Sequence, residues 1–386
     1  MTMKITKLLR IKPQAGALLL LFLATSGALG QTGPTRPSIK LIRAPEGGIQ
    51  PQAAVDEKGV AHLIYLKGDP KAAELLYTHS QDGEKFGPAI PVNDTTKGVM
   101  AIGNIRGAQL AVGKSQRVHI TWMGGGKIMY YTRLNDEGTA FEPPRNLVTW
   151  AGGLDGGGTV AADKKGNVYV AWNGAPPDNK ANELGRAIFV ARSTDDGKTF
   201  SREERATGPD IGVCACCGMR GYADSRGNVY FLYRAADGKS RDMILLASTD
   251  SGKTFRPSTI SKWEVNMCPM SSSTFAESSD ALLAATERSG QVSFARIAQE
   301  SAIPSEVTTA PGMGRRKHPV VAVNAKGETL LAWTENMGWA KGGSLAWQLY
   351  DKDHQPIGEK GGARGVPTWS LITGFAKPNG DFVIVY

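Results

Sequence analysis

The strongest constraint on the fold of this chain is a short segment that recurs seven times along its 386 residues. Each copy is a turn, in most cases with a glycine, followed by a run rich in β-branched and aromatic residues; DKKGNVYVAWN from Asp163 and DSRGNVYFLYR from Asp224 are two of them. Successive copies lie 47 to 61 residues apart, as marked by Gly59, Gln116, Gly166, Gly227, Asp280, Gly327 and Gly380. A period of this size is typical of solenoids, propellers and other repeat arrays.

The residues around each turn predict three further strands per repeat. A short apolar run precedes the turn, as at residues 108–112, and a third strand follows after a variable loop, as at residues 187–193. Most repeats then add a fourth strand, as at residues 88–92. A four-stranded unit repeated at this interval is a propeller blade, and one blade cannot bury both of its faces alone. We therefore predict an all-β fold: a seven-bladed β-propeller of four-stranded antiparallel blades.

The two ends of the chain predict how the ring closes. The last repeat stops at Tyr386 after two strands, and residues 39–43 (IKLIR) form a spare strand near the N-terminus. Pairing these segments would complete the seventh blade and cover two open sheet edges. A six-bladed propeller is the alternative, if the terminal strands merge into one blade.

The first thirty residues have the pattern of an export signal. Four lysines and arginines lie between positions 4 and 12, residues 15–24 are apolar, and Ala28-Leu29-Gly30 supplies the small residues that a signal peptidase reads. Ten apolar residues are too few to cross about 30 Å of hydrocarbon. We predict a signal peptide at residues 1–30, a propeller domain at residues 31–386, and an exported protein, periplasmic or extracellular.

Charge and composition limit the expected partners. The formal net charge is +9, and removing the predicted signal takes away four basic residues and no acids, which leaves +5. Residues 315–317 are the only basic triplet and carry no interleaved aromatic platform, so nucleic acid is not expected as a partner. After the signal, no stretch is long and apolar enough for a membrane span. We expect a carbohydrate or protein ligand instead.

A second motif recurs where the third strand turns into the fourth. Its two full copies fit S-x-D-x-G-x-x-F, with motif residues Ser193, Asp195, Gly197, Phe200, Ser248, Asp250, Gly252 and Phe255. In such a turn the aspartate accepts hydrogen bonds from nearby backbone amides and the glycine permits a positive φ. These segments resemble the Asp boxes, or bacterial neuraminidase (BNR) repeats, of the sialidase superfamily. The resemblance implies a propeller whose boxes are structural and lie on the face opposite the ligand site.

The same resemblance implies what a working sialidase would carry in addition. The family pattern has an arginine in an R-I-P motif, two more arginines that clamp the substrate carboxylate, a Tyr–Glu nucleophile pair and an aspartic acid/base. Arg43-Ala44-Pro45 lies where R-I-P would be, and no tyrosine is identifiable as the nucleophile. The candidate catalytic residues are Arg43, Arg106, Arg220, Arg316, Asp155 and Asp210.

All four cysteines fall in two segments, VCACCGM from Val213 and NMCPM from Asn266. Each segment connects the outer strand of one predicted blade to the inner strand of the next, which places it on the loop face near the axis, where propellers bind ligands. A C-x-C-C followed by a C-P in the next blade is similar to a pattern in a subset of exported sialidase-like proteins.

Three interpretations of the cysteines remain open. The first is disulfides in an oxidising compartment, for which Cys214–Cys217 with Cys216–Cys268 avoids a strained vicinal bridge. The second is a soft-metal site, because thiolates with nearby methionines or His318 suit Cu or Zn. The third is a redox-active pair. No metal is assigned, and the candidate ligands are the same four cysteines.

Three function classes follow. The first is a recognition propeller that binds a glycan or protein on the axial loop face, with candidate contacts Arg106, Arg220, Trp263, His318 and Trp339. The second is an exo-α-sialidase-type glycoside hydrolase on the same face. The third is a metal or redox site at the cysteines. The missing nucleophile favours recognition over hydrolysis.

Overall fold

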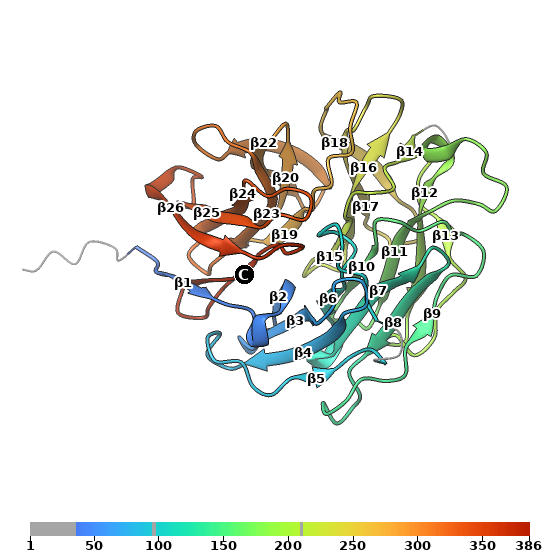
Figure 1. Ribbon diagram of the computed structural model, residues 1–386, viewed down its shortest axis with the longest axis horizontal. Helices are drawn as coiled ribbons and strands as arrows, with labels where there is room; N and C mark the ends of the chain where they lie inside the picture. Colours follow the sequence, from blue (N-terminus) through green and yellow to red (C-terminus); the bar gives the residue numbers. More distant parts are fainter. Residues whose placement is uncertain (1–35, 95–97, 209–210) are drawn as a thin grey trace, which may run out of the picture. The chain divides into compact units, whose positions relative to one another are not determined.

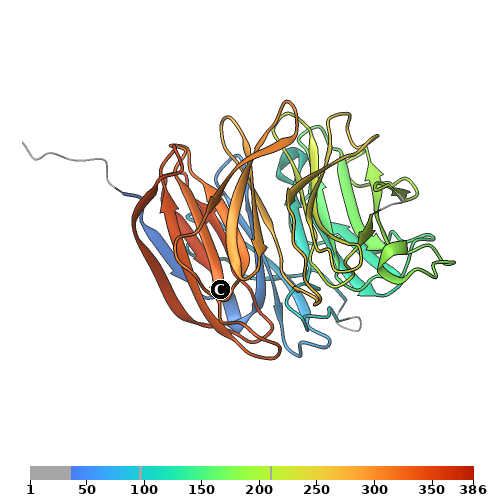
Figure 2. The same ribbon diagram turned by 90° about the horizontal axis from the view of Figure 1, so that it is seen from above.

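The seven sequence repeats form seven separate sheets in the computed structural model, which describes residues 36–94, 98–208 and 211–386. Residues 37–386 belong to one compact unit, and within it the sheets are arranged radially around an axis (Figures 1 and 2). The predicted seven-bladed propeller is confirmed, and the six-bladed alternative is not favoured. The predicted signal peptide, residues 1–30, lies outside the described residues.

The first six blades each run from an inner to an outer strand in chain order. Blades 1 to 3 are β2 (Ile49–Val55), β3 (Ala61–Lys67), β4 (Glu74–Ser80) and β5 (Ile90–Pro91); β6 (Gln109–Val112), β7 (Val118–Gly125), β8 (Ile128–Arg133) and β9 (Arg145–Asn146); and β10 (Gly158–Ala162), β11 (Val168–Gly174), β12 (Ala187–Ser193) and β13 (Glu204–Arg205). Blades 4 to 6 are β15 (Arg220–Ala223), β16 (Val229–Ala236), β17 (Met243–Ser248) and β18 (Arg256–Ser261); β19 (Thr274–Glu277), β20 (Leu282–Arg288), β21 (Gln291–Ala298) and β22 (Ile303–Thr309); and β23 (Arg316–Val323), β24 (Thr329–Glu335), β25 (Gly343–Tyr350) and β26 (Pro356–Val366). A further short strand, β14 (Gly212–Val213), also pairs with β16.

The seventh blade joins the two ends of the chain, as predicted. It consists of β27 (Thr373–Ala376), β28 (Phe382–Val385) and the N-terminal β1 (Ile39–Ile42), and β1 pairs with β28 in parallel. The blue β1 therefore lies beside the red C-terminal strands (Figure 1). Since β1 and β28 would otherwise be open edges next to each other, their pairing closes the ring.

The second strand of each blade forms the centre of its sheet, which explains the repeated apolar runs. Every residue of β11 (VYVAWNG) is buried, because both faces of its sheet are covered by neighbouring blades. The fifth position of this strand is aromatic in five blades, and all five side chains are fully or nearly fully buried: Tyr65, Trp122, Trp172, Tyr233 and Trp333. These large residues fill the wedge between blades.

Hydrogen bonds from threonines join neighbouring inner strands around the axis. In alternate blades, a threonine hydroxyl near the start of the inner strand accepts a hydrogen bond from a backbone amide of the following blade. These bonds join Gly221 N to Thr159 Oγ1, Val321 N to Thr274 Oγ1 and Ala53 N to Thr373 Oγ1, at 2.7, 3.0 and 3.2 Å. The inner strands are thus held by directional contacts as well as by packing.

Antiparallel order gives the propeller two different ends. Turns between strands one and two and between strands three and four lie at one end, the turn face. Connections between blades and between strands two and three lie at the other end, the loop face. An axial channel of about 680 Å³ is lined by the inner strands and by their turns, such as residues 56–59, so it opens on the turn face.

The two S-x-D-x-G-x-x-F segments form closed turns on the turn face. In the first, Asp195 Oδ1 accepts hydrogen bonds from the Ser193 hydroxyl at 2.7 Å and the Thr199 amide at 2.9 Å, and Gly197 has φ +78°. Asp250 makes the equivalent contacts with Ser248 and Thr254. Both turns lie away from the loop face, because they connect a third strand to a fourth.

Replacing Asp195 or Asp250 by alanine is expected to lower the free energy of unfolding by about 1 to 3 kcal/mol, because the turn amides lose their acceptor. Although burial opposes ionisation, hydrogen bonds from Thr199 and Ser193 hold the pKa of Asp195 at about 2. The pKa is lower in the folded than in the unfolded chain, so this contribution is complete above about pH 4 and is lost as the pH falls toward 2. Chemical denaturation of the wild type and both variants between pH 2 and 7 measures this contribution to stability. Equal stability of variant and wild type at pH 7 would contradict a stabilising role of the aspartates.

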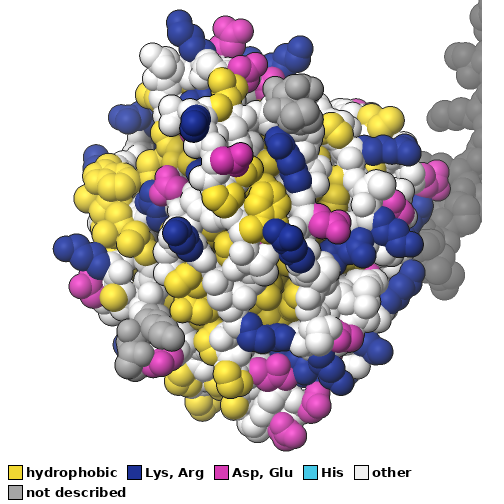
Figure 3. Space-filling model, turned by 90° about the vertical axis from the view of Figure 1, so that its right-hand side faces the viewer, with side chains coloured by type: hydrophobic (Ala, Val, Ile, Leu, Met, Phe, Trp, Pro, Cys, Tyr) yellow, Lys and Arg dark blue, Asp and Glu magenta, His cyan; other side chains and the backbone are white. Residues whose placement is uncertain are grey.

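Surface charges are mixed in sign. On the side that Figure 3 displays, lysine and arginine side chains lie among aspartates and glutamates. Among the residues that the structure describes, none of the helices has the length and hydropathy of a membrane span.

Candidate functional site at the cysteine loop

A break in the inner strand of blade 4 creates the cysteine loop. Both β14 and β15 pair with the same edge of β16: Val213 lies opposite Ala235, and Arg220 lies opposite Leu232. Residues 214–219 leave the sheet between these two pairings and project onto the loop face. The sequence does not predict this break, because the segment reads only as a connection between blades.

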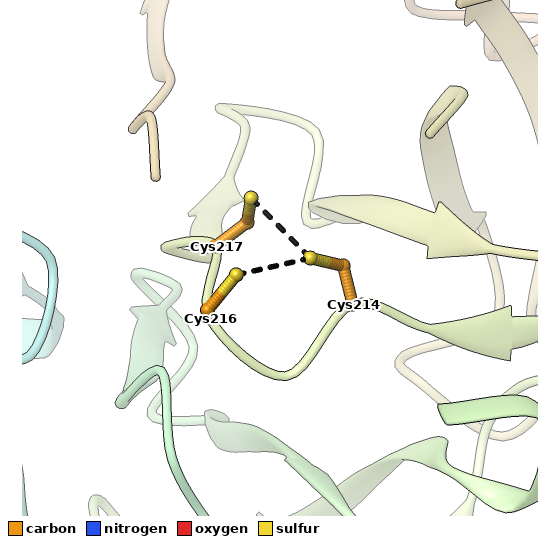
Figure 4. Close-up of side chains that lie close together, drawn as sticks. All are labelled: Cys214, Cys216 and Cys217. Carbon is orange, nitrogen blue, oxygen red and sulfur yellow. Dashed lines mark hydrogen bonds between the residues drawn. The ribbon is translucent and has the colours of Figure 1, made fainter. Parts of the chain in front are cut away.

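Three cysteine sulfurs meet in this loop (Figure 4). Cys214 Sγ lies 3.4 Å from Cys216 Sγ and 3.6 Å from Cys217 Sγ. The structure joins Cys216 to Cys268, in the connection between blades 4 and 5, by a disulfide with a Cα–Cα distance of 6.7 Å. Cys214 and Cys217 are buried and are not bonded to each other. The expected Cys214–Cys217 bridge is therefore absent, because 3.6 Å is a contact between two thiols and not a covalent bond.

The same geometry decides how a soft metal would fit. The sulfurs of Cys214, Cys216 and Cys217 lie within 4.8 Å of one another, a spacing that one thiophilic ion could bridge. In this state Cys216 is oxidised, so it is not a thiolate and cannot ligate as one. A Cu or Zn site would require reduction of the disulfide first.

The two unbonded cysteines have opposite electrostatic surroundings. The Cys214 thiol donates a hydrogen bond to Cys217, which lowers the pKa of Cys217 despite its burial. Arg234 and the backbone amides of Ser271 and Met270 stabilise the same thiolate. The hydrogen bond to Cys217 and burial raise the pKa of Cys214. Cys217 is therefore the more acidic thiol of the pair and Cys214 the less acidic one.

A hollow of about 210 Å³ borders the disulfide on the loop face. Its wall includes Cys268, Met270, Lys317, His318, Trp339 and Trp369, which come from blade 6 and from the connections between blades 4 and 5 and between blades 6 and 7. Trp339 is 64% exposed, and its ring meets Trp369 edge-on with centroids 4.8 Å apart. We name this hollow the tryptophan pocket.

The polar side chains of the tryptophan pocket are held in place. His318 has φ +52°, and its Nδ1 lies 3.1 Å from Ser272 Oγ. Burial and the neighbouring Lys317 lower the pKa of His318 to about 3, so the imidazole is neutral at physiological pH. Lys317 Nζ donates a hydrogen bond to Pro269 O. His318 and Trp339 were predicted as ligand contacts; Lys317 and Asn104, which also line the pocket, were not predicted, because neither belongs to a motif.

Of the arginine candidates, Arg106 and Arg220 lie near the axis, but both are already partnered. Arg106 Nη2 lies 2.6 Å from Asp155 Oδ1, so the two candidates neutralise each other. Arg220 Nη2 donates to Gln52 Oε1 across the channel at 2.6 Å, and its Nε donates to Ser273 O. Burial lowers the pKa of Arg220 to about 10.

The remaining predicted residues lie elsewhere. Arg43 stacks on Tyr386 at the closing strand, and Arg316 is fully buried, with its guanidinium over the ring of Trp333. Trp263 packs against Arg234, with 5.0 Å from the guanidinium carbon to the ring centroid. Asp210 lies outside the described residues. Arg43 and Arg316 are therefore engaged by contacts within the propeller.

The axial channel holds a Tyr–Glu pair that the sequence did not reveal. Tyr222 on β15 donates a hydrogen bond to Glu277 Oε2 on β19 at 3.2 Å. Burial and the Glu277 carboxylate raise the pKa of Tyr222, so the phenol stays protonated. Glu277 also accepts hydrogen bonds from Ser225 and Gln299. The pair therefore ties the inner strands of blades 4 and 5 together, close to the turn that contains Ser225.

Known proteins share the fold of this chain. The sequence matches no protein-family model, and no curated protein is similar enough in sequence to be matched. Among solved structures, a Hadza microbial sialidase is 14% identical, covers 79% of this chain and 70% of its own, and has a TM-score of 0.51. A Penicillium chrysogenum α-L-arabinanase complexed with arabinobiose is 13% identical, with 83% and 99% covered and a TM-score of 0.53. An ulvan lyase is 10% identical, with 80% of each chain covered and a TM-score of 0.50. At these identities the similarity concerns the propeller fold.

Proposed function

We propose that this chain is an exported carbohydrate-binding propeller whose ligand site is the tryptophan pocket. The observation that carries the proposal is the exposed indole of Trp339 at the rim, set edge-on against Trp369. Trp122, Trp172 and Trp333 are buried between blades, so an indole that is 64% exposed is not part of that core. A flat aromatic face beside a hollow with polar groups suits a sugar ring.

The polar groups of the pocket match an uncharged or acidic sugar. The neutral His318 both donates and accepts hydrogen bonds, and Lys317 adds a positive charge. A hollow of 210 Å³ is smaller than the roughly 300 to 1,000 Å³ of drug-sized pockets, so it accommodates one terminal ring. The carbohydrate-active proteins that share the fold support this ligand class, and the partnered arginines favour recognition over hydrolysis of a sialoside.

The proposal predicts that Trp339→Ala weakens carbohydrate binding at least about tenfold, the loss typical of a central aromatic contact. A glycan array identifies the ligand with wild-type protein, and titration calorimetry compares the variants. Met313→Ala is the matched control, since Met313 is a 91% exposed apolar residue in another connection of the loop face. Equal affinity of Trp339→Ala and Met313→Ala would overturn the site, and a wild-type protein that binds no glycan would overturn the ligand class.

A further inference from the structure

Carbohydrate binding does not explain why two unbonded cysteines lie beside a disulfide. The disulfide reaches the surface, because Cys268 is exposed and lines the tryptophan pocket. Cys214 and Cys217 are buried at 2% and 3% exposure. A purely structural bridge needs no thiol neighbours, and buried structural cysteines are usually inert and isolated.

The four sulfurs form a continuous chain from the surface to the interior. Cys268 is bonded to Cys216, Cys216 Sγ lies 3.4 Å from Cys214 Sγ, and Cys214 Sγ lies 3.6 Å from Cys217 Sγ. Thiol–disulfide exchange requires a sulfur nucleophile in contact with one sulfur of a disulfide. Cys214 is in that position without movement of the backbone.

The surroundings supply the charge and the proton acceptor that exchange requires. Cys217 accepts the hydrogen bond of the Cys214 thiol, so it can take the proton as Cys214 attacks. Arg234 on β16 and Lys317 on β23 place positive charge near Cys217, and Arg186 lies near Cys214. The acidic groups in these surroundings are Glu183, whose carboxylate accepts the amide hydrogen bond of Ala215, Glu287 beside Arg234, and Asp155 near Arg186.

We propose that the cysteine loop is a thiol–disulfide exchange centre, in which Cys214 attacks the Cys216–Cys268 disulfide and frees an exposed Cys268 thiolate toward external disulfides. In the first step the Cys214 proton moves to Cys217, the Cys214–Cys216 bond forms, and the Cys216–Cys268 bond breaks with Cys268 as the leaving thiolate. In the second step Cys217 loses its proton to Cys268 or solvent and attacks Cys214, and Cys216 leaves as a thiolate. The Cys216–Cys268 disulfide has been replaced by a buried Cys214–Cys217 disulfide, and the protein has neither gained nor lost electrons.

The freed Cys268 thiolate stands at the rim of the tryptophan pocket, where it can meet a partner. The class of substrate is a low-molecular-weight or peptide disulfide. Cys268 attacks one of its sulfurs, forms a mixed disulfide, and releases the other sulfur as a thiolate, which also conserves electrons. The exchange involves only the cysteines and an external disulfide, so it can be tested without a glycan. Its failure would leave the proposed carbohydrate binding untouched.

Alkylation under native conditions tests the exchange. Oxidised wild-type protein is incubated with N-ethylmaleimide, digested without reduction, and analysed by mass spectrometry. We expect the label on Cys268, together with a disulfide between Cys214 and either Cys216 or Cys217. In Cys214→Ser, which keeps the Cys216–Cys268 bridge, labelling of Cys268 should fall at least tenfold. In Cys217→Ser it should also slow, because the proton acceptor is gone. Oxidised glutathione should form a mixed disulfide at Cys268 in the wild type but not in Cys214→Ser.

Several outcomes would overturn the proposal. Label on Cys214 or Cys217 with the Cys216–Cys268 bridge intact would show a static disulfide. Equal labelling of Cys268 in wild type and Cys214→Ser would show that the bridge opens by another route. Four reduced cysteines with one equivalent of copper or zinc in purified protein would identify a metal site instead. Thermal melting of both serine variants establishes that they are folded. Met313→Ala keeps all four cysteines and lies far from them in sequence, so it should label like the wild type.

Discussion

Deleting residues 36–42 is expected to abolish cooperative folding of the propeller. These residues supply β1, which pairs with β28 along four residues and adds Ile39, Leu41 and Ile42 to the apolar packing of blades 6, 7 and 1. These three side chains are partly buried, so each contributes less than the roughly 1.5 to 3 kcal/mol of a fully buried one. Their loss, together with the lost strand pairing and the open edge of β28, removes a large part of the stability of a typical domain, about 5 to 15 kcal/mol. The measurement is thermal unfolding followed by circular dichroism and calorimetry.

A shorter truncation provides the control for the deletion. A variant that begins at Arg36 keeps β1 and should melt as the full-length chain does. A point substitution separates strand pairing from burial: Leu41→Asp should destabilise strongly, whereas Lys40→Asp should have a small effect, because Lys40 is exposed. A deletion variant with an unchanged, cooperative melting transition would contradict closure by β1.

Cys268→Ser is expected to lower the free energy of unfolding by about 4 kcal/mol, the chain-entropy value for a bridge that spans 52 residues. The bridge restricts the unfolded chain between blades 4 and 5, whereas any bridge among Cys214, Cys216 and Cys217 closes a loop of only a few residues. Urea unfolding without reductant measures the difference. Reduced wild-type protein should have the stability of the variant, and a difference below about 1 kcal/mol would contradict a stabilising role of the bridge.

The sequence was sufficient to predict the repeat architecture and the closing strand. The turn and its strand recur every 47 to 61 residues, which gives the number of blades. A strand at each end of the chain lacks a partner, and pairing these two edges gives the closure. The same logic placed the cysteine segments between blades. It did not show that β14 and β15 share one edge of β16, because two short strands around a loop have no periodicity.

Contacts between side chains of different blades could not be predicted from the sequence. Arg106 and Asp155 are 49 residues apart and meet only because their loops converge, so each was a candidate until the ion pair was seen. Tyr222 and Glu277 lie on adjacent inner strands, which sequence spacing does not reveal. The state of Cys214 and Cys217 depends on a sulfur separation of 3.6 Å that no spacing rule predicts.

The tryptophan pocket could be predicted in part. Trp339 was predicted as a contact in a connection of the loop face, and His318 was predicted beside the cysteines. Trp263, which lies in a similar connection, packs against Arg234 instead. Whether a residue in such a connection faces a hollow or a neighbouring blade depends on backbone geometry. His318 illustrates this: its backbone has φ +52°, and its ring lies beside Ser272.

Hydrogen–deuterium exchange with and without a saturating glycan tests the central claim, carbohydrate binding at the tryptophan pocket, most directly. The account predicts that added protection is confined to the pocket walls, in peptides that contain Cys268, His318, Trp339 and Trp369. The first-to-second-strand turns that line the channel mouth, such as residues 56–59, should exchange unchanged. Protection at those turns, with none around Trp339, would place the ligand at the opposite end of the propeller and contradict the account.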